Sequence, residues 1–245
     1  MSAHRVLFGF HAVTVRLKTA PESVLEIHFD ATRRDARMRQ FVERAGAARA
    51  KLVESDDASL QKMCGTHRHQ GVVARVDPVF KARTLAEVLE DVQGEPLLLL
   101  LDGVTDPHNL GACLRVADGA GVQAVIAPKD HAVGINGTVA KVASGAAETV
   151  PYLMVTNLSR TIAELKSHHI RIIGTAEDAP TTLYEADLTG PVALVLGAEG
   201  AGLRQLTRRS CDALVRIPLH GAVESLNVSV AAGICLFEAR RQRDG

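Results

Sequence analysis

Six short apolar runs between residues 97 and 217 constrain the fold of this chain more than any other feature of its sequence. The first run reads LLLLL, and the others are also apolar at successive rather than alternate positions. A strand of this kind is buried on both faces, which is typical of a parallel sheet covered by helices on each side. Stretches with helical periodicity separate the runs, so we predict a doubly wound α/β domain. The predicted strands cover residues 97–101, 122–127, 152–155, 170–174, 192–197 and 213–217.

The N-terminal part of the chain alternates more rapidly between strand and helix patterns, which predicts a small separate α/β unit. Its predicted strands cover residues 24–29, 50–55 and 70–76, and its predicted helices cover residues 33–46 and 57–65. Between the units, Thr84 and Glu87 form a capping-box signature ahead of a short helix. The expected organisation is therefore a first domain over 1–76, a linker over 77–95 and a second domain over 96–245.

The charge of the chain is balanced overall but uneven along its length. The 28 basic and 28 acidic residues leave no net charge, which by itself argues against a nucleic-acid partner. Residues 1–72, however, carry 12 Lys and Arg against 8 Asp and Glu, whereas the remainder carries 16 against 20. A basic module joined to an acidic one fits delivery to RNA, but a solvated basic surface fits equally well. Because only 3% of the residues are aromatic, RNA recognition would depend mainly on Arg and Lys contacts with phosphates and on RNA shape.

Cysteine use and hydropathy indicate a cytoplasmic protein. Cys64, Cys113, Cys211 and Cys235 are scattered with no CxxC pair, so we expect reduced and mostly buried thiols. No apolar run approaches the roughly 20 residues of a membrane span, and the start of the chain lacks a signal-peptide pattern. His67 and His69 have no further ligand cluster near them in the sequence, so we predict no metal and expect surface or RNA-contacting histidines.

A polar motif follows the first apolar run, at residues 101–122. Asp106 could cap a helix that has Pro107 in its first turn, and the apolar positions after it recur with helical spacing. Arg115 lies beside this apolar stripe, where burying a guanidinium is unfavourable unless something pairs with it. The partner could be a structural carboxylate or a substrate. Asn109 lies six residues earlier, on a different face of an ideal helix, so it must occupy the entry turn or act with Arg115 across a subunit interface.

Two further motifs follow later strands. LVLGAEGAGL (194–203) places glycines directly after a predicted strand, without the GxGxxG fingerprint or a P-loop lysine, so nucleotide phosphate binding is poorly supported. A tight turn explains these glycines as well as a ligand site does, although Glu199 could pair with a cation. In residues 217–241, Ser225 could cap a helix that is apolar nearly all round, including Val230, Ile234 and Phe237. Such a helix is deeply buried or shared with a partner subunit.

Taken together, residues 102–122, 194–203 and 217–239 resemble, in this order, the three motifs of the SpoU (TrmH-type) ribose 2′-O-methyltransferases. The N-terminal GFHAV (9–13) and HRHQGVVA (67–74) resemble the RNA-binding domain of the RlmB-type branch, which modifies a guanosine in 23S ribosomal RNA. The resemblance spans essentially the whole chain, and the combination of motifs is far more specific than any one of them.

The resemblance implies a fold and an activity that the residue pattern alone does not. It implies an L30e/L7Ae-like N-terminal RNA-binding domain and a C-terminal SPOUT domain with a trefoil knot, whereas the pattern alone favours an unknotted sheet. It also implies a cytoplasmic homodimer that uses S-adenosyl-L-methionine, without metal, to methylate a guanosine ribose of 23S rRNA in the peptidyl-transferase region. The implied catalytic residues are Asn109, Arg115, Glu199, Ser225 and Asn227, and the implied cofactor-binding residues are Thr175, Gly197, Ile217 and Leu226.

The implied chemistry suits these residue types. A ribose 2′-hydroxyl is a weak nucleophile until its proton is shared or removed, so an enzyme must orient it and stabilise developing negative charge. Arg115 could do this while contacting a phosphate, with Asn109 and Glu199 holding it and Ser225 and Asn227 shaping the site. The alternatives are the same chemistry on tRNA or another rRNA site, a non-catalytic RNA-binding assembly factor, and capping alone for Ser225 and Asn227.

Overall fold

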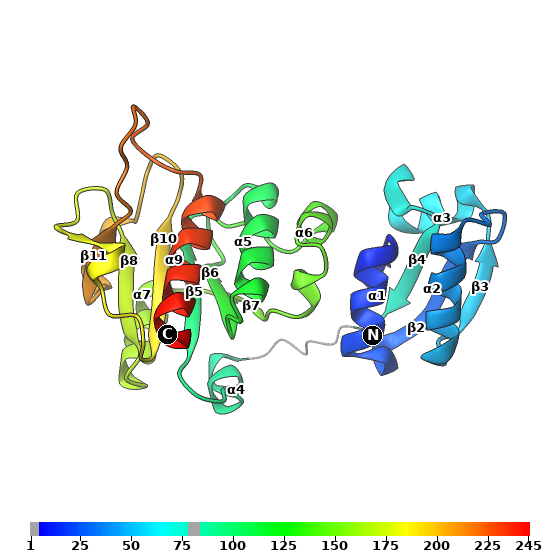
Figure 1. Cartoon of the computed structure of the whole chain (residues 1–245), viewed down its shortest axis with the longest axis horizontal. Coiled ribbons are helices and arrows are strands. Elements are labelled where there is room, and N and C mark those ends of the chain that lie inside the picture. Colours follow the sequence, from blue (N-terminus) through cyan, green and yellow to red (C-terminus); the bar gives the residue numbers. More distant parts are fainter. Residues whose placement is uncertain (1–4, 78–83) are drawn as a thin grey trace. The chain divides into compact units, whose positions relative to one another are not determined.

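The computed structural model describes residues 5–77 and 84–245, which form two compact units divided between Lys81 and Ala82 (Figure 1). Of the expected linker over 77–95, residues 78–83 lie outside the described part.

The N-terminal unit contains a four-stranded sheet with helices packed against it (Figure 1). The strand order is β1-β4-β2-β3, in which β2 and β3 are parallel and the other neighbours are antiparallel. The strands are β1 (Arg5–Phe8), β2 (Val24–Asp30), β3 (Leu52–Ser55) and β4 (Val72–Val76), and the helices are α1 (Phe10–Thr19), α2 (Ala36–Ala47) and α3 (Asp57–Cys64), with 3-10 turns at Pro21–Ser23 and His67–His69.

Every element predicted in this unit is present, and two more were missed. Helix α2 begins three residues later than predicted, because the Asp35 side chain accepts the Met38 N–H at 3.0 Å and so caps the helix there. The missed elements are β1 and α1, whose apolar residues form runs too short and too rich in β-branched side chains for an unambiguous periodicity. In the structure Phe10, Val13 and Leu17 of α1 are buried in the core of the unit.

The C-terminal unit is built on a seven-stranded, fully parallel sheet in the order β7-β6-β5-β10-β8-β11-β9. All six predicted strands are confirmed, and only the two-residue edge strand β9 was not predicted. The first run, residues 97–101, is completely buried, as expected for a central strand covered on both faces. The strands are β5 (Leu97–Asp102), β6 (Ala124–Pro128), β7 (Tyr152–Val155), β8 (Arg171–Thr175), β9 (Thr181–Thr182), β10 (Val192–Gly197) and β11 (Ala213–Arg216).

Alternate leucines of β5 point into two different cores. Leu99 belongs to the core formed with helices α5 and α9, whereas Leu100 belongs to the core formed with α4 and α7. Helix α4 lies within the expected linker, yet its Leu85 and Val88 are buried against the second of these cores, and the predicted capping box of Thr84 is present. The helices of this unit are α4 (Leu85–Glu90), α5 (Pro107–Gly119), α6 (Gly137–Val142), α7 (Leu158–Ser167), α8 (Gln205–Ser210) and α9 (Val228–Asp244), with 3-10 turns at Ala146–Glu148 and Leu183–Glu185.

The order of the strands brings distant motifs to one edge of the sheet. From β5 the chain adds β6 and β7 on one side, and it then returns to place β8 and β10 on the other. Open α/β sheets bind ligands at such a switch point, outside the carboxyl ends of the strands. Here the strands that meet are β5 and β10, and Asp102 pairs in register with Gly197.

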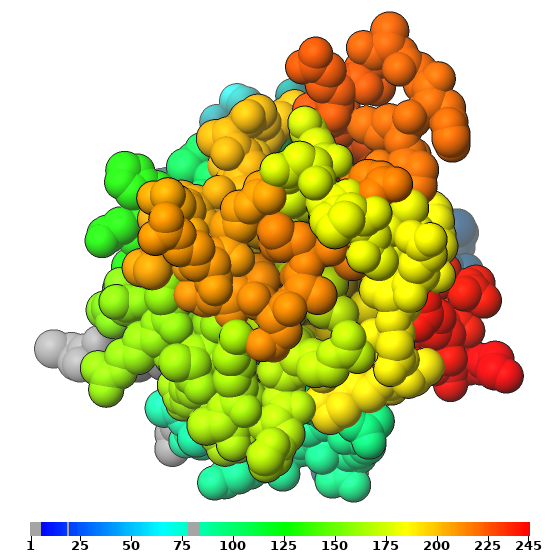
Figure 2. Space-filling view, turned by 90° about the vertical axis from the view of Figure 1, so that its left-hand side faces the viewer, coloured from blue at the N-terminus to red at the C-terminus, as the bar shows by residue number. Residues whose placement is uncertain are grey.

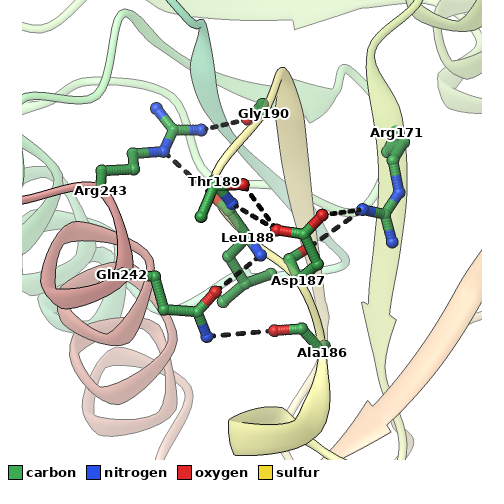
Figure 3. Close-up of polar contacts among 8 residues, drawn as sticks. All are labelled: Arg171, Ala186, Asp187, Leu188, Thr189, Gly190, Gln242 and Arg243. Atoms are coloured by element: carbon green, nitrogen blue, oxygen red, sulfur yellow. Dashed lines mark hydrogen bonds and ion pairs between the residues drawn. The ribbon is translucent and has the colours of Figure 1, made fainter. Parts of the chain in front are cut away.

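The end of α9 fastens a loop to the rest of the C-terminal unit (Figure 3). The Arg243 guanidinium donates to the carbonyls of Leu188 at 3.0 Å and Gly190 at 2.6 Å, and also to those of residues 95 and 96. The Gln242 amide adds bonds to the Leu188 N–H and the Ala186 carbonyl. One side chain thus satisfies four main-chain acceptors that adjoin the amino ends of β5 and β10.

We predict that Arg243→Ala destabilises the C-terminal unit by about 2 kcal/mol, because four carbonyls lose a charged donor. Calorimetry should show a melting temperature about 4–8 °C lower. Arg209→Ala is the control, since this side chain is exposed on α8 and has no hydrogen-bond or ion-pair partner in the described structure. An equal effect of the two substitutions would contradict the fastening role.

Candidate active site at the carboxyl edge of the parallel sheet

The glycine-rich motif forms a tight hairpin at the end of β10. After Gly197 the chain turns back on itself, with Ala198 and Gly202 exchanging main-chain hydrogen bonds of 3.2 and 2.9 Å. A Cβ atom on Gly197 would lie only 2.0 Å from the carbonyl carbon of Gly202, so no other residue fits without moving the main chain. The glycine at 197 is therefore required by the close approach of two segments of backbone.

An ion pair between a buried carboxylate and an exposed arginine anchors the exit of this hairpin. Asp102, the last residue of β5, has a fully buried carboxylate that accepts the main-chain N–H of Arg204 at 3.0 Å and its Nε–H at 2.6 Å. Loss of the Arg204 side chain would leave the buried carboxylate without its charged donor, which is unfavourable even though the arginine itself is 47% exposed. Our sequence reasoning missed this pair, although a carboxylate that closes a run of five leucines was a signal for it.

Beside the hairpin lies a pocket of about 330 Å³, lined by three segments of the C-terminal unit and by Arg208 of α8. The segments are residues 175–178 after β8, residues 196–203 around the hairpin, and parts of residues 215–231. The last segment includes the connection from β11 to α9, which projects beyond the rest of the C-terminal unit (Figures 1 and 2). Six residues predicted for the site line this pocket: Thr175, Gly197, Glu199, Ile217, Ser225 and Leu226.

Two arginines hold the pocket wall after β8 in place. Arg208 of α8 donates to both carboxylate oxygens of Asp178 at 2.9 Å. Arg216 of β11 donates to the carbonyls of Ala179 and Pro180, each at 2.5 Å. These contacts fix residues 178–180 against the two elements that follow the hairpin in sequence.

The charges around the pocket favour a cationic ligand. Its two arginines are both occupied by the contacts above, whereas Glu177, Glu199 and Glu224 have no ion-pair partner among the described residues. The volume of about 330 Å³ lies within the usual range for small-molecule sites. A small ligand with positive charge therefore fits both the space and the electrostatics.

Two predicted catalytic residues meet beside the pocket without lining it. Asn227 donates its side-chain N–H to Asn109 Oδ1 at 2.9 Å, and Asn109 lies in the first turn of α5, as expected. Asn227 also caps α9 by accepting the Ser229 N–H at 2.9 Å. The prediction that Ser225 caps this helix is wrong, because α9 begins at Val228 and only the residue directly before it has capping geometry.

Arg115 stands apart from the other predicted residues. Its side chain is exposed on α5 and has no hydrogen bond or ion pair with any residue that the structure describes. The expected contacts with Asn109 and Glu199 are therefore not formed within one chain. Because the guanidinium is exposed to solvent, it keeps its hydration and needs no partner to compensate for burial.

The remaining sequence expectations concern metals, membranes and thiols. Within residues 5–77 and 84–245, no cluster of three or more metal-ligating side chains is present. The expectation of a surface His69 is wrong, because this side chain is 1% exposed and its Nδ1 accepts the Gly71 N–H at 3.1 Å. All four cysteines are free, and Cys113 and Cys235 are buried. None of the described helices has the length and apolar character needed to cross a bilayer.

Both units match known families at the level of sequence. Residues 96–237 match the SpoU rRNA Methylase family, and residues 6–82 match the family described as RNA 2′-O ribose methyltransferase substrate binding. A protein of Ralstonia nicotianae named 23S rRNA (guanosine-2′-O-)-methyltransferase RlmB is 60% identical over 99% of this chain and 98% of its own length. A protein of the same name from a Burkholderia species is 58% identical over 98% and 97%.

Solved structures share the whole fold. The SpoU methyltransferase AviRb from Streptomyces viridochromogenes, in complex with the cofactor AdoMet, superposes with a TM-score of 0.82. It is 24% identical and covers 99% of this chain and 91% of its own, so it supports the fold alone. A structure titled as an RNA 2′-O ribose methyltransferase gives a TM-score of 0.80 at 28% identity, covering 100% and 90% of the two chains.

The geometry of the hairpin predicts how the pocket responds to a single methyl group. Gly197→Ala should weaken binding of S-adenosylhomocysteine, an analogue of the ligand expected from the sequence, by at least about tenfold, because the hairpin must move. Gly200→Ala in the same loop has no atom within 4 Å of the new Cβ and should cause a clearly smaller loss, from its left-handed backbone alone. Titration calorimetry measures both, and equal losses would show that the Gly197 contact is not what shapes the pocket.

Proposed function

Because this chain belongs to the SpoU rRNA methylase family, we propose that it transfers a methyl group from S-adenosyl-L-methionine to the ribose 2′-hydroxyl of a guanosine in 23S rRNA. The observation that carries the proposal is the pocket at the carboxyl edge of the sheet. It contains all four predicted cofactor-binding residues, its shape depends on Gly197, and its unpaired carboxylates suit a cationic donor.

The residues present fit this donor. Thr175, Gly197, Ile217 and Leu226 all line the pocket and would hold the donor. When bound, S-adenosyl-L-methionine supplies an electrophilic methyl group on a positively charged sulfur. The carboxylates of Glu177, Glu199 and Glu224 favour that positive charge by proximity, although their exposure to solvent screens the effect.

The remaining task of the protein is to present the 2′-hydroxyl in line with the methyl group. We assign Arg115 to orient the hydroxyl and an adjacent phosphate, which suits a planar guanidinium with five donors. A guanidinium stays protonated at neutral pH, so Arg115 stabilises negative charge and does not remove the proton. Ser225 lies at the mouth of the pocket, and the pair of Asn109 and Asn227 fixes the start of α9 beside it.

We further propose that the enzyme is a homodimer formed through α5 and α9. Val230 and Phe237 are 50% and 53% exposed although both are large apolar residues of α9. Phe237 lies beside Gly119 of α5, one helical turn from Arg115. A partner covering this surface would bury the apolar side chains and bring Arg115 to a pocket that it does not reach within its own chain.

The proposal extends to three points of location and topology. The path of the chain after β11 supports a trefoil knot in the C-terminal unit. The segment after β11 starts on the far side of β8 and returns to α5, where Asn227 bonds to Asn109. A cytoplasmic site of action fits the four free cysteines and an rRNA substrate. A target in the peptidyl-transferase region follows from the sequence resemblance. Relatives named for 23S rRNA match both units along their full length, which favours this substrate over tRNA.

The test of the function is methyl transfer to 23S rRNA from cells that lack this protein. We predict that the wild-type chain adds one 2′-O-methylguanosine, and that Arg115→Ala and Arg115→Lys each lower single-turnover transfer by at least about a hundredfold. Lysine should not rescue the rate, because it keeps the charge but lacks the planar fork. Affinity for S-adenosylhomocysteine should stay unchanged, because the role assigned to Arg115 is to hold the hydroxyl and phosphate of the RNA and not the methyl donor. An active Arg115→Lys enzyme would make the guanidinium dispensable, and an inactive wild type would refute the function.

The dimer makes a separate prediction. Phe237→Glu should yield a folded monomer without methyl-transfer activity, because a carboxylate at an apolar interface is unfavourable whereas on the exposed helix it is tolerated. Leu206→Glu is the control: this leucine is 63% exposed on α8, outside the proposed interface. Sedimentation equilibrium measures the mass of both variants. A wild-type protein that is an active monomer would contradict the proposal.

A further inference from the structure

Part of the basic charge of the N-terminal unit is neutralised within the sheet. The Glu26 carboxylate accepts from Lys51 at 3.1 Å and from Arg75 at 3.0 Å, and His28 lies 3.3 Å away. The hydrogen bond from Lys51, with those from His28 and Arg75, lowers the pKa of Glu26 to about 2. Lys51 and Arg75, like His28, are therefore already paired with Glu26 and are poorly suited to hold an anionic ligand.

Other arginines of the same unit lack such a partner. Arg34, Arg37 and Arg68 are exposed, and none of their guanidinium groups has an ion-pair partner among the described residues. Arg34 lies just before α2, Arg37 lies in its first turn, and Arg68 lies in the 3-10 turn before Gln70. Their positive charge faces solvent.

Hydrogen bonds bring these segments together around Gln70. The Gln70 carbonyl accepts from Arg33 Nη1 at 2.7 Å, and its side-chain oxygen accepts the N–H of Phe10 at 3.4 Å. Next to it, Gly71 accepts the Asp30 N–H at 2.9 Å. The N-terminal motifs GFHAV and HRHQG thus meet each other and the loop that leads into α2.

The guanidinium groups of Arg33 and Arg37 both lie over the ring of Phe10, next to Gln70. Arg37 Cζ lies 4.6 Å and Arg33 Cζ 5.2 Å from the centroid of the Phe10 ring, which is almost completely buried. Phe41 packs edge-on against the same ring at 5.4 Å, so the ring is fixed from behind. A guanidinium held over a ring keeps a defined position at low entropic cost. Arg37 nevertheless remains exposed to solvent, so its guanidinium is accessible.

We propose that Arg34, Arg37 and Arg68 form a surface, the guanidinium platform, that grips an unpaired segment of the RNA substrate. Arg33 lies beside them, but its guanidinium is already paired with the Asp35 carboxylate and so supports the platform rather than the ligand. A guanidinium plane can stack on a base and donate to phosphates at the same time, but only a base that has left the helical stack offers its face. A duplex would meet only the charge. The inference deepens the proposed function and rests on it, because it assumes an RNA substrate.

The test compares full-length variants in binding to unmodified 23S rRNA transcript, measured by filter binding between about 50 and 300 mM salt. Arg37→Ala should weaken binding at least about tenfold and flatten the salt dependence by about one phosphate contact. Arg37→Lys restores the charge without the plane and should recover only part of this loss. Lys51→Ala, an exposed cation already paired with Glu26, should stay within about twofold of wild type. In methyl transfer, Arg37→Ala should raise KM for RNA and leave kcat and S-adenosylhomocysteine affinity unchanged.

The outcomes separate the platform from the function itself. A wild-type protein that neither binds nor methylates the transcript would refute the proposed function, whatever Arg37 does. An active wild type with Arg37→Ala binding as tightly as Lys51→Ala would overturn the platform. An Arg37→Lys variant with wild-type affinity would overturn the stacking of a base and leave only charge.

Discussion

The pairing of Asp102 with Arg204 joins the two strands on which the site is built. Asp102 ends β5, a fully buried strand next to the middle strand β10, and Arg204 follows the glycine hairpin more than a hundred residues later. Because the carboxylate is wholly buried, it is stable as an anion only with its charged and main-chain donors in place. The hairpin is therefore fixed against the end of β5. Because the hairpin forms one wall of the adjacent pocket, this contact also determines the shape of the pocket. Loss of the Asp102–Arg204 pair would therefore weaken ligand binding, although it would leave the side chains of residues 175–178 and 215–231 unchanged.

The sequence predicted most of the sheet because its strands are apolar at most positions and at successive rather than alternate ones. A run such as residues 97–101 is too short for a typical helix and too apolar for a surface, so the buried strand is the reading that remains. Where this signal was weak, prediction stopped: β1 and α1 mix apolar and polar residues without a clear period, and β9 spans two residues. The trefoil knot was expected from family resemblance alone, since local patterns do not encode how a chain threads.

The site was predicted less evenly than the sheet. Glycines after a strand located the pocket, and the family resemblance identified six of its lining residues, five of them within the three motifs. The role of Asn227 as the helix cap depended on where α9 begins, within one residue, and sequence places helix ends less accurately than that. Arg115 was expected inside a network because its neighbours along the helix are buried. Its exposure depends on which side of α5 is covered in a single chain, and that is a property of tertiary packing.

The hydrogen bonds from Arg243 to the loops near the amino ends of β5 and β10 also affect when each unit can fold during synthesis. A ribosome delivers a chain from its N-terminus, and the acceptors of this guanidinium emerge long before the donor does. Helix α9 supplies a large part of one core as well, with Ala232, Cys235 and Leu236 fully buried. The first unit can fold while synthesis continues, whereas the second unit lacks both a core layer and the Arg243 contacts until helix α9 has left the ribosome. A nascent chain therefore carries its RNA-binding module before it carries a finished methyl-donor pocket.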